Sequence, residues 1–176
     1  MKQHLPNKTV NFEETMLPHL DAAYNLARWL TRDTADADDV VQEAFLRAFK
    51  FFDGFHGGNA RAWILKIVRN TCYSWLQENR GHEIAAEFDE EQHSVVAHDT
   101  EAVLIENIDA QILKRLLDEL PLEFREVIIL RELEGMSYKE IAGVSNLPLG
   151  TVMSRLARAR ARLHTGLISC LKGELN

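Results

Sequence analysis

Apolar residues recur at steps of three and four positions through the first part of the chain. The runs extend over residues 12–30, 40–52 and 63–76. This spacing places the apolar side chains on one face of a helix, so the pattern predicts three amphipathic helices. Pro18 predicts a start or a kink within the first run, because proline has no N–H to donate inside a helix. The carboxylates in 33–39 favour a helix start there, since they complement the positive end of the helix dipole.

The same helical spacing returns in the last third of the chain. We expect one helix to end at Pro121 and a second to run from Glu123 to Glu132, with Gly135 as its stop signal. No stretch of the sequence shows the alternation of apolar and polar residues that is typical of a half-buried strand. The pattern therefore predicts an all-α protein.

Residues from about 138 to 157 have the pattern of a helix-turn-helix. Ser137 and Glu140 form a capping box, which predicts a helix start. Asn146 tolerates the left-handed conformation of a tight turn, and Pro148 suits the entry to a second helix. That helix has an apolar stripe made of Val152, Leu156, Ala159 and Leu163.

A basic face accompanies this apolar stripe. Arg155, Arg158 and Arg162 fall on another side of the second helix, and no acidic residue lies between Gly150 and Leu163. The arginines therefore have no acidic partner three or four residues away within the helix. An uncompensated basic face on a helix-turn-helix favours contact with DNA phosphates. The alternative is an amphipathic surface helix whose arginines are only solvated.

Two earlier helices also carry polar faces. On the helix at 62–80 this face combines basic, amide, hydroxyl and aromatic side chains, which suit an exposed nucleic-acid strand. An ordinary polar helix face is an equally good interpretation of its composition. On the helix at 36–52, Phe45, Phe49 and Phe52 are expected in the core. The opposite side could meet a protein partner, although a plain solvated face is favoured by the pattern alone.

Charge is distributed unevenly along the chain. The formal net charge is −7 at pH 7, yet the stretch 81–111 contains nine acidic residues and no lysine or arginine. The segments 61–80 and 150–164 are net basic, so the whole-chain charge says little about any DNA-facing surface. We expect two small helical domains, at 11–80 and 108–170, joined by an acidic linker at 81–107.

The sequence contains no motif for enzymatic chemistry. Its seven histidines form no metal-ligand spacing, and no nucleophile elbow, phosphate loop or paired-carboxylate motif is present. Cys72 and Cys170 lack the spacing of a metal site or a disulfide framework. We therefore expect no enzyme, no metal and no cofactor. No apolar run approaches membrane-spanning length, so we also expect a cytoplasmic protein with no membrane insertion.

Three segments of the chain closely resemble bacterial sigma factors. They are DADDVVQEAFLRAFKFFDGF at 36–55, NARAWILKIVRNTCYSWLQENR at 59–80 and LPLEFREVIILRELEGMSYKEIAGVSNLPLGTVMSRLARARARL at 120–163. The resemblance is strongest to the extracytoplasmic-function (ECF) subgroup of the sigma-70 family, which keeps only sigma regions 2 and 4. It implies that 11–80 is region 2 and that 108–170 is region 4.

The resemblance also implies a role for each polar surface. The helix at 38–52 is similar to the family's surface for the clamp coiled coil in the largest subunit of core RNA polymerase, with Asp39, Gln42, Glu43, Leu46 and Arg47 as candidates. The segment 55–80 looks like the region that reads and melts the promoter −10 element by capturing a flipped base, with Asn59, Arg61, Lys66, Arg69, Asn70, Tyr73 and Ser74 as candidates. The helix-turn-helix is similar to the −35 reader, with Thr151, Met153, Ser154, Arg155 and Arg158 as candidates.

Met153 departs from the pattern of many relatives, which carry a basic residue at this position. Methionine cannot make a bidentate contact to guanine, so apolar contact is what remains for it.

The function that follows is that of a transcription initiation factor. Such a protein binds core RNA polymerase, directs it to promoters with −10 and −35 elements, and helps to open the DNA. The resemblance makes an anti-sigma factor a further expected partner. Two alternatives are a stand-alone helix-turn-helix regulator and an interaction protein that holds a sigma partner without reading DNA. The helical first half argues against the regulator, and the arginine face argues against the interaction protein.

Overall fold

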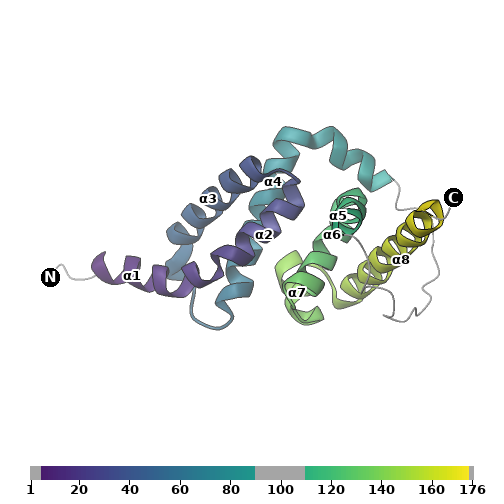
Figure 1. Cartoon of the computed structure of the whole chain (residues 1–176). Coiled ribbons are helices and arrows are strands. Elements are labelled where there is room, and N and C mark those ends of the chain that lie inside the picture. The colour runs from purple at the N-terminus through teal and green to yellow at the C-terminus, as the bar shows by residue number, and fades with distance from the viewer. Residues whose placement is uncertain (1–4, 90–109, 175–176) are drawn as a thin grey trace.

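The computed structural model of the chain describes residues 5–89 and 110–174, and in these two ranges it contains helices and no strand (Figure 1). This confirms the all-α prediction. The helices are α1 (Leu5–Met16), α2 (Leu20–Thr31), α3 (Thr34–Phe51), α4 (Ala60–Asp89), α5 (Ala110–Glu119), α6 (Leu122–Ile128), α7 (Tyr138–Ser145) and α8 (Leu149–Glu174). Most of the predicted acidic linker lies outside the described residues.

Helices α2, α3 and α4 pack against one another and form the body of the N-terminal half. Pro18 lies in a short 3-10 turn (η1, Leu17–His19) between α1 and α2, which confirms the predicted break. Asp33 is the N-cap of α3, where its carboxylate accepts hydrogen bonds from the backbone N–H groups of Ala35 (2.8 Å) and Asp36 (3.0 Å). The acidic start predicted for this helix is therefore present, and a side-chain cap stabilises it.

An aromatic cluster joins α1 to the end of α3. The ring of Phe12 meets the rings of Phe45, Phe49 and Phe52 edge to face, with centroids 5.2–6.3 Å apart. The prediction that Phe49 belongs to the core is wrong, since 37% of its surface remains exposed. Phe49 lies at the margin of the contact, where Phe12 meets its ring and the ammonium group of Lys8 lies 5.3 Å from the ring centroid.

The C-terminal half is built around α6, which is buried along its whole length. The predicted helix at 123–132 exists, but it widens into a π-helical segment (η5, Ile129–Leu133) before it ends. Gly135 follows with a φ of +63°, a left-handed conformation that glycine adopts without steric cost, and this confirms it as the stop signal. Helix α8 packs on α6, α5 packs on α8, and α7 packs on both α8 and η5.

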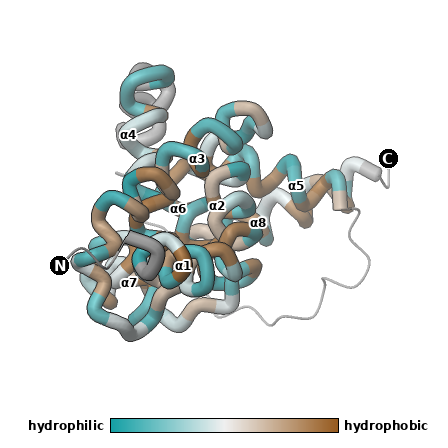
Figure 2. The backbone as a smooth tube through the Cα atoms, turned by 90° about the vertical axis from the view of Figure 1, so that its left-hand side faces the viewer, coloured by the Kyte–Doolittle hydropathy of each residue, from teal (hydrophilic) through white to brown (hydrophobic). Residues whose placement is uncertain are grey.

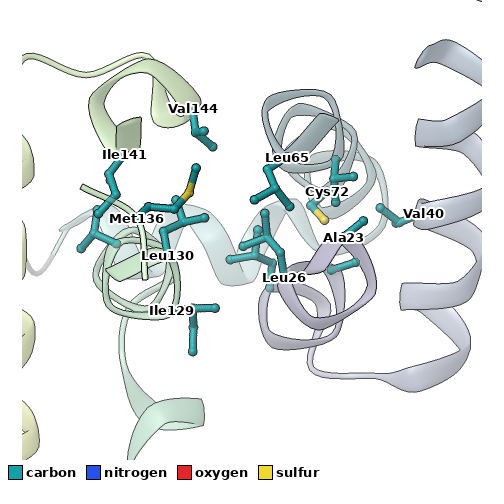
Figure 3. Packing of buried hydrophobic residues seen from close by; sticks show 14 of the residues in the cluster. Ala23, Leu26, Val40, Leu65, Cys72, Ile129, Leu130, Met136, Ile141 and Val144 are labelled. Carbon is teal, nitrogen blue, oxygen red and sulfur yellow. The ribbon is translucent and has the colours of Figure 1, made fainter. Parts of the chain in front are cut away.

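The two halves share one continuous hydrophobic core. Helix α2 packs on α6 and η5, and α4 packs on α7. Figure 3 shows Leu26 and Leu65 of the N-terminal half opposite Leu130 and Met136 of the C-terminal half, all of them buried. Burial of one such side chain stabilises a fold by about 1.5–3 kcal/mol. The hydrophobic segments accordingly gather in the middle of the molecule, around α2, α6 and α8 (Figure 2).

Candidate nucleic-acid interface

The helix-turn-helix has the local geometry that its sequence predicts. The Ser137 hydroxyl accepts a hydrogen bond from the Glu140 N–H (3.2 Å), and the Glu140 carboxylate accepts one from the Ser137 N–H (2.7 Å), which completes the capping box. The hydrogen bond that the Ser137 N–H donates to the carboxylate holds the pKa of Glu140 below its ordinary value. Asn146 ends α7 in the left-handed conformation, with φ 55° and ψ 47°. Helix α8 then begins at Leu149.

Helix α8 divides into a buried side and an exposed start. Val152, Leu156 and Ala159 are buried against the core. Met153 is 51% exposed and Ser154 is also exposed, whereas Thr151 and Arg158 are half-buried. The exposed part of the candidate −35 surface therefore combines an apolar side chain with a hydroxyl.

Two arginines of α8 have acidic partners on other elements, so the expectation of an uncompensated basic face is wrong for Arg155. Arg155 forms an ion pair with Glu123 of α6 (2.8 Å), and only 17% and 5% of the two side chains are exposed. Arg160 forms a more exposed pair with Glu132 of η5 (2.7 Å). The guanidinium of Arg162 lies 5.0 Å from the ring centroid of Phe124. These partners come from α6 and η5, which only the folded chain brings beside α8.

The polar face of α4 divides in a similar way. Lys66, Asn70 and Ser74 are exposed. Arg69 and Tyr73 instead point to the C-terminal half, where both donate hydrogen bonds to the carboxylate of Glu126. The Tyr73 hydroxyl is 2.5 Å from Oε2 of Glu126, and Nε of Arg69 is 2.7 Å from Oε1.

The environment of Glu126 changes the acidity of both partners. Burial raises the pKa of Tyr73 well above its ordinary value, and the adjacent Glu126 carboxylate raises it further, because a phenolate there would be desolvated and repelled. Burial alone would lower the pKa of Arg69, but Glu126 and Tyr73 outweigh it, so the net shift is upward. Both side chains are held in their protonated, hydrogen-bond-donating forms.

The loop before α4 contributes two more of the candidate −10 residues. The side-chain oxygen of Asn59 accepts a hydrogen bond from the Ala62 N–H (2.9 Å), as a helix cap does. Its amide nitrogen donates to Glu140 of α7 (2.7 Å). Arg61 forms an ion pair with Glu134 (2.5 Å). Asn59 and Arg61 are thus tied to the C-terminal half, like Arg69 and Tyr73.

The sequence did not predict the acidic partners in these contacts, Glu126 and Glu134. Glu126 and Glu134 belong to none of the surfaces that the pattern singles out. A signal for Glu126 does exist in FREVIIL (124–130), where Arg125 is the one other residue that is not apolar. A buried carboxylate needs hydrogen-bond donors, and the sequence does not say which segment supplies them.

The candidate core-polymerase residues lie on the outer side of α3. Asp39, Gln42, Glu43 and Arg47 are exposed, and Glu43 pairs with Arg47 one helical turn away. Leu46 is 72% exposed, and Phe51 near the end of the helix is also largely exposed. Exposed apolar side chains framed by charged ones are typical of a protein–protein contact.

The described residues contain neither a cluster of metal ligands nor a membrane-spanning helix. No group of three or more His, Cys, Asp or Glu side chains in residues 5–89 and 110–174 is arranged to hold a metal ion. Within the same residues, no helix has the length and apolar character needed to cross a membrane.

Comparison with known proteins identifies the family. Residues 16–81 match the family described as Sigma-70 region 2, and residues 110–163 match Sigma-70, region 4. The ECF RNA polymerase sigma-E factor of Escherichia coli is 34% identical over 137 residues, which cover 72% of this chain and 71% of that protein. The ECF RNA polymerase sigma factor SigE of Mycolicibacterium smegmatis is 33% identical over 156 residues, and the match spans 87% of this chain and 60% of that relative's length.

Solved structures agree with these sequence matches. The sigma factor RpoE from Bartonella quintana, in complex with the anti-sigma factor NepR, superposes with a TM-score of 0.69 at 33% identity, covering 89% of this chain and 96% of that one. CnrH, in complex with the cytosolic domain of CnrY, superposes with a TM-score of 0.63 at 27% identity, covering 90% and 88%. With both sigma regions matched in order, the chain belongs to the ECF RNA polymerase sigma factors of the sigma-70 family.

Proposed function

We propose that this sigma factor binds core RNA polymerase, directs it to promoters with −10 and −35 elements, and helps to melt the DNA. The observation that carries the proposal is the presence of both sigma regions in one chain, each with a polar helix face suited to DNA. Residues 11–80 would act as region 2 and residues 108–170 as region 4, joined by the acidic linker at 81–107. The chemistry of RNA synthesis belongs to the polymerase, so the chain itself needs no catalytic residue or cofactor.

The outer side of α3 is the proposed contact with the clamp coiled coil of core polymerase. Its exposed polar residues can pair across the interface, and Leu46 can enter an apolar pocket. Interfaces of this kind depend on a few well-buried anchors within a polar rim. Leu46 is the anchor that the exposure pattern favours.

The face of α4 is the proposed reader of the −10 element. Lys66 and Arg69 suit phosphates, Asn70 and Ser74 suit base edges, and Tyr73 suits stacking on an unpaired base. Extruding a base from the duplex costs a few kcal/mol, and these contacts would recover that cost. Asn59 and Arg61 extend the same surface from the preceding loop.

The start of α8 is the proposed reader of the −35 element. The exposure of Met153 supports apolar contact with a thymine methyl group in the major groove, and Thr151 and Ser154 can donate hydrogen bonds beside it. Arg158 is the candidate for a phosphate. Arg155 remains a candidate DNA contact, although its ion pair with Glu123 supports a positioning role for this residue.

An anti-sigma factor is a further proposed partner. The sigma factor RpoE is in complex with the anti-sigma factor NepR, and CnrH is in complex with the cytosolic domain of CnrY. This chain matches most of both RpoE and CnrH. The proposed partners, RNA polymerase and promoter DNA, also favour a cytoplasmic location.

In vitro transcription with purified, sigma-free core polymerase tests the proposal. The chain should confer start-site selection on core at promoters upstream of transcripts that its overexpression induces. Replacing Arg158 by alanine should reduce the salt dependence of −35 binding by about one unit of log–log slope if it contacts one phosphate. Sequence-specific DNA binding without core, together with no start-site selection in its presence, would favour a stand-alone regulator and would refute the proposal.

A further inference from the structure

Phe51 is a largely exposed aromatic side chain at the end of α3, with 59% of its surface accessible to water. The next two phenylalanines along the chain are engaged, since Phe52 and Phe55 pack against the hydrophobic core and against the ring of Trp63. Helix α3 lies on the side of the N-terminal half that faces away from the C-terminal half (Figures 1 and 3). Its outer side is therefore open to a partner.

The candidate core-polymerase residues belong to two ridges on this outer side. Residues four positions apart on a helix lie one above the other, and such rows are the ridges that pack into the grooves of a partner helix. One ridge consists of Asp39, Glu43, Arg47 and Phe51, and the ridge beside it of Gln42, Leu46 and Lys50. All of these side chains are exposed. Phe51 thus continues a ridge that already holds three of the candidates.

We propose that Phe51 is a second apolar anchor of the contact with the clamp coiled coil of core RNA polymerase, in addition to Leu46. This inference rests on the proposed function of α3. At about 100° per residue, Leu46 and Phe51 lie about 140° apart around the helix axis. A single partner helix covers a stripe of about 100°, so it does not bury both side chains. A coiled coil presents two helices, and each of them can receive one anchor.

Charged side chains fill the strip between the two anchors. Glu43 and Arg47 form an ion pair there, and the ammonium group of Lys50 lies 5.7 Å from the centroid of the Phe51 ring. Polar groups around well-buried anchors set the orientation of a complex, whereas the anchors supply most of the binding energy. Aromatic residues are enriched among such anchors. The surface therefore has the composition of a contact with another protein.

Nucleic acid is the other partner that an exposed aromatic ring beside a lysine can bind, by stacking on an unpaired base. The neighbours of Phe51 favour the polymerase instead. Arg47 lies about one turn before Phe51 on the same ridge, whereas the candidate −10 residues lie on α4 and on the loop before it. Base stacking is therefore the alternative that the experiment has to separate from the anchor role.

The experiment measures the dissociation constant between the fluorescently labelled chain and purified, sigma-free core polymerase. Phe51→Ala removes the anchor, and Phe51→Leu keeps an apolar side chain at the same place. Leu17→Ala is the matched control, because Leu17 is also a large apolar residue of the N-terminal half and is 48% exposed. Binding of each variant to a short fluorescent single-stranded DNA of random sequence is measured without core, and circular dichroism checks the fold.

Phe51→Ala should weaken core binding by about five- to twentyfold, because the contact would bury the exposed 59% of this side chain. Phe51→Leu should lose less affinity, and Leu17→Ala should keep the native value. Binding to single-stranded DNA should stay native in all three variants. If Phe51→Ala loses its helical circular dichroism, Phe51→Gln takes its place with the same predicted loss of core affinity.

Two results would overturn the inference. One is equal core affinity of Phe51→Ala and Leu17→Ala. The other is a loss of DNA binding in Phe51→Ala with native core affinity, which would assign Phe51 to base stacking.

Failure of this inference can be distinguished from failure of the proposed function by a substitution of Leu46. If Leu46→Ala weakens core binding while Phe51→Ala does not, the contact through α3 stands and the second anchor is refuted. A native chain that does not bind core polymerase would refute the proposed function itself, whatever the variants show.

Discussion

The ion pair between Arg155 and Glu123 allows a direct test of what this arginine does. In Arg155→Ala, the carboxylate of Glu123 loses the guanidinium 2.8 Å away while only 5% of the glutamate side chain is exposed. Removing one partner of a buried pair costs about 3–5 kcal/mol, because the remaining buried charge loses that counter-charge. Since 17% of the Arg155 side chain is exposed, water can partly replace it, and we expect a loss of about 2–4 kcal/mol in the free energy of unfolding.

The assay is thermal and urea unfolding followed by circular dichroism. For a protein of this size, a loss of about 2–4 kcal/mol lowers the melting temperature by about 5–15 °C. Arg160→Ala is the control, since it removes an arginine from the same helix. Arg160 pairs with Glu132, and both side chains of this pair are about half exposed. An exposed pair contributes about 0–1 kcal/mol, so the control should unfold close to the native temperature.

The double variant Glu123→Leu/Arg155→Leu extends the test. It removes both charges and leaves apolar side chains in their place, so it should recover much of the lost stability. If Arg155→Ala is no less stable than Arg160→Ala, and weakens −35 binding with a smaller salt slope, the positioning role is refuted and Arg155 is a phosphate contact.

Three further predictions concern other parts of the molecule. Replacing the exposed Gln42 and Glu43 of α3 by arginine should abolish association with core polymerase in a pull-down while the circular dichroism spectrum stays native; retained association would contradict the α3 assignment. Asp33→Ala should lower the free energy of unfolding by about 1 kcal/mol, because two backbone N–H groups of α3 lose their cap; an unchanged urea midpoint would show that water replaces it. The folded-state pKa of Glu140 is lowered, so its contribution to stability is complete above its unfolded pKa and is lost as pH falls through the folded value. We therefore expect the free energy of unfolding, measured by urea unfolding at a series of pH values, to fall less steeply in Glu140→Gln than in the native chain below the ordinary glutamate pKa. Parallel pH curves for the two proteins would contradict this contribution of Glu140.

Local structure was predictable because its causes lie within a few residues of one another. The capping box needs only Ser137 and Glu140, which are three positions apart, and both of its hydrogen bonds form as the sequence predicts. The left-handed Asn146 and the positive φ of Gly135 likewise follow from the conformational preferences of single residues. The helical spacing of apolar residues predicted the buried stripe of α8 for the same reason.

The tertiary structure decided which charged side chains are paired within the protein. The pattern along α8 indicated a free arginine face, because no acidic residue lies three or four positions from these arginines within the helix. The acidic partner of Arg155 is Glu123, which lies on another helix. Nothing local in the sequence joins Glu126 to Arg69 and Tyr73 across the two halves. The sequence by itself thus determined the helices, their caps and the sigma family. Packing determined the partner of each charged side chain, because an ion pair depends on distance in space, and two helices far apart in the chain come together only through the core that they share.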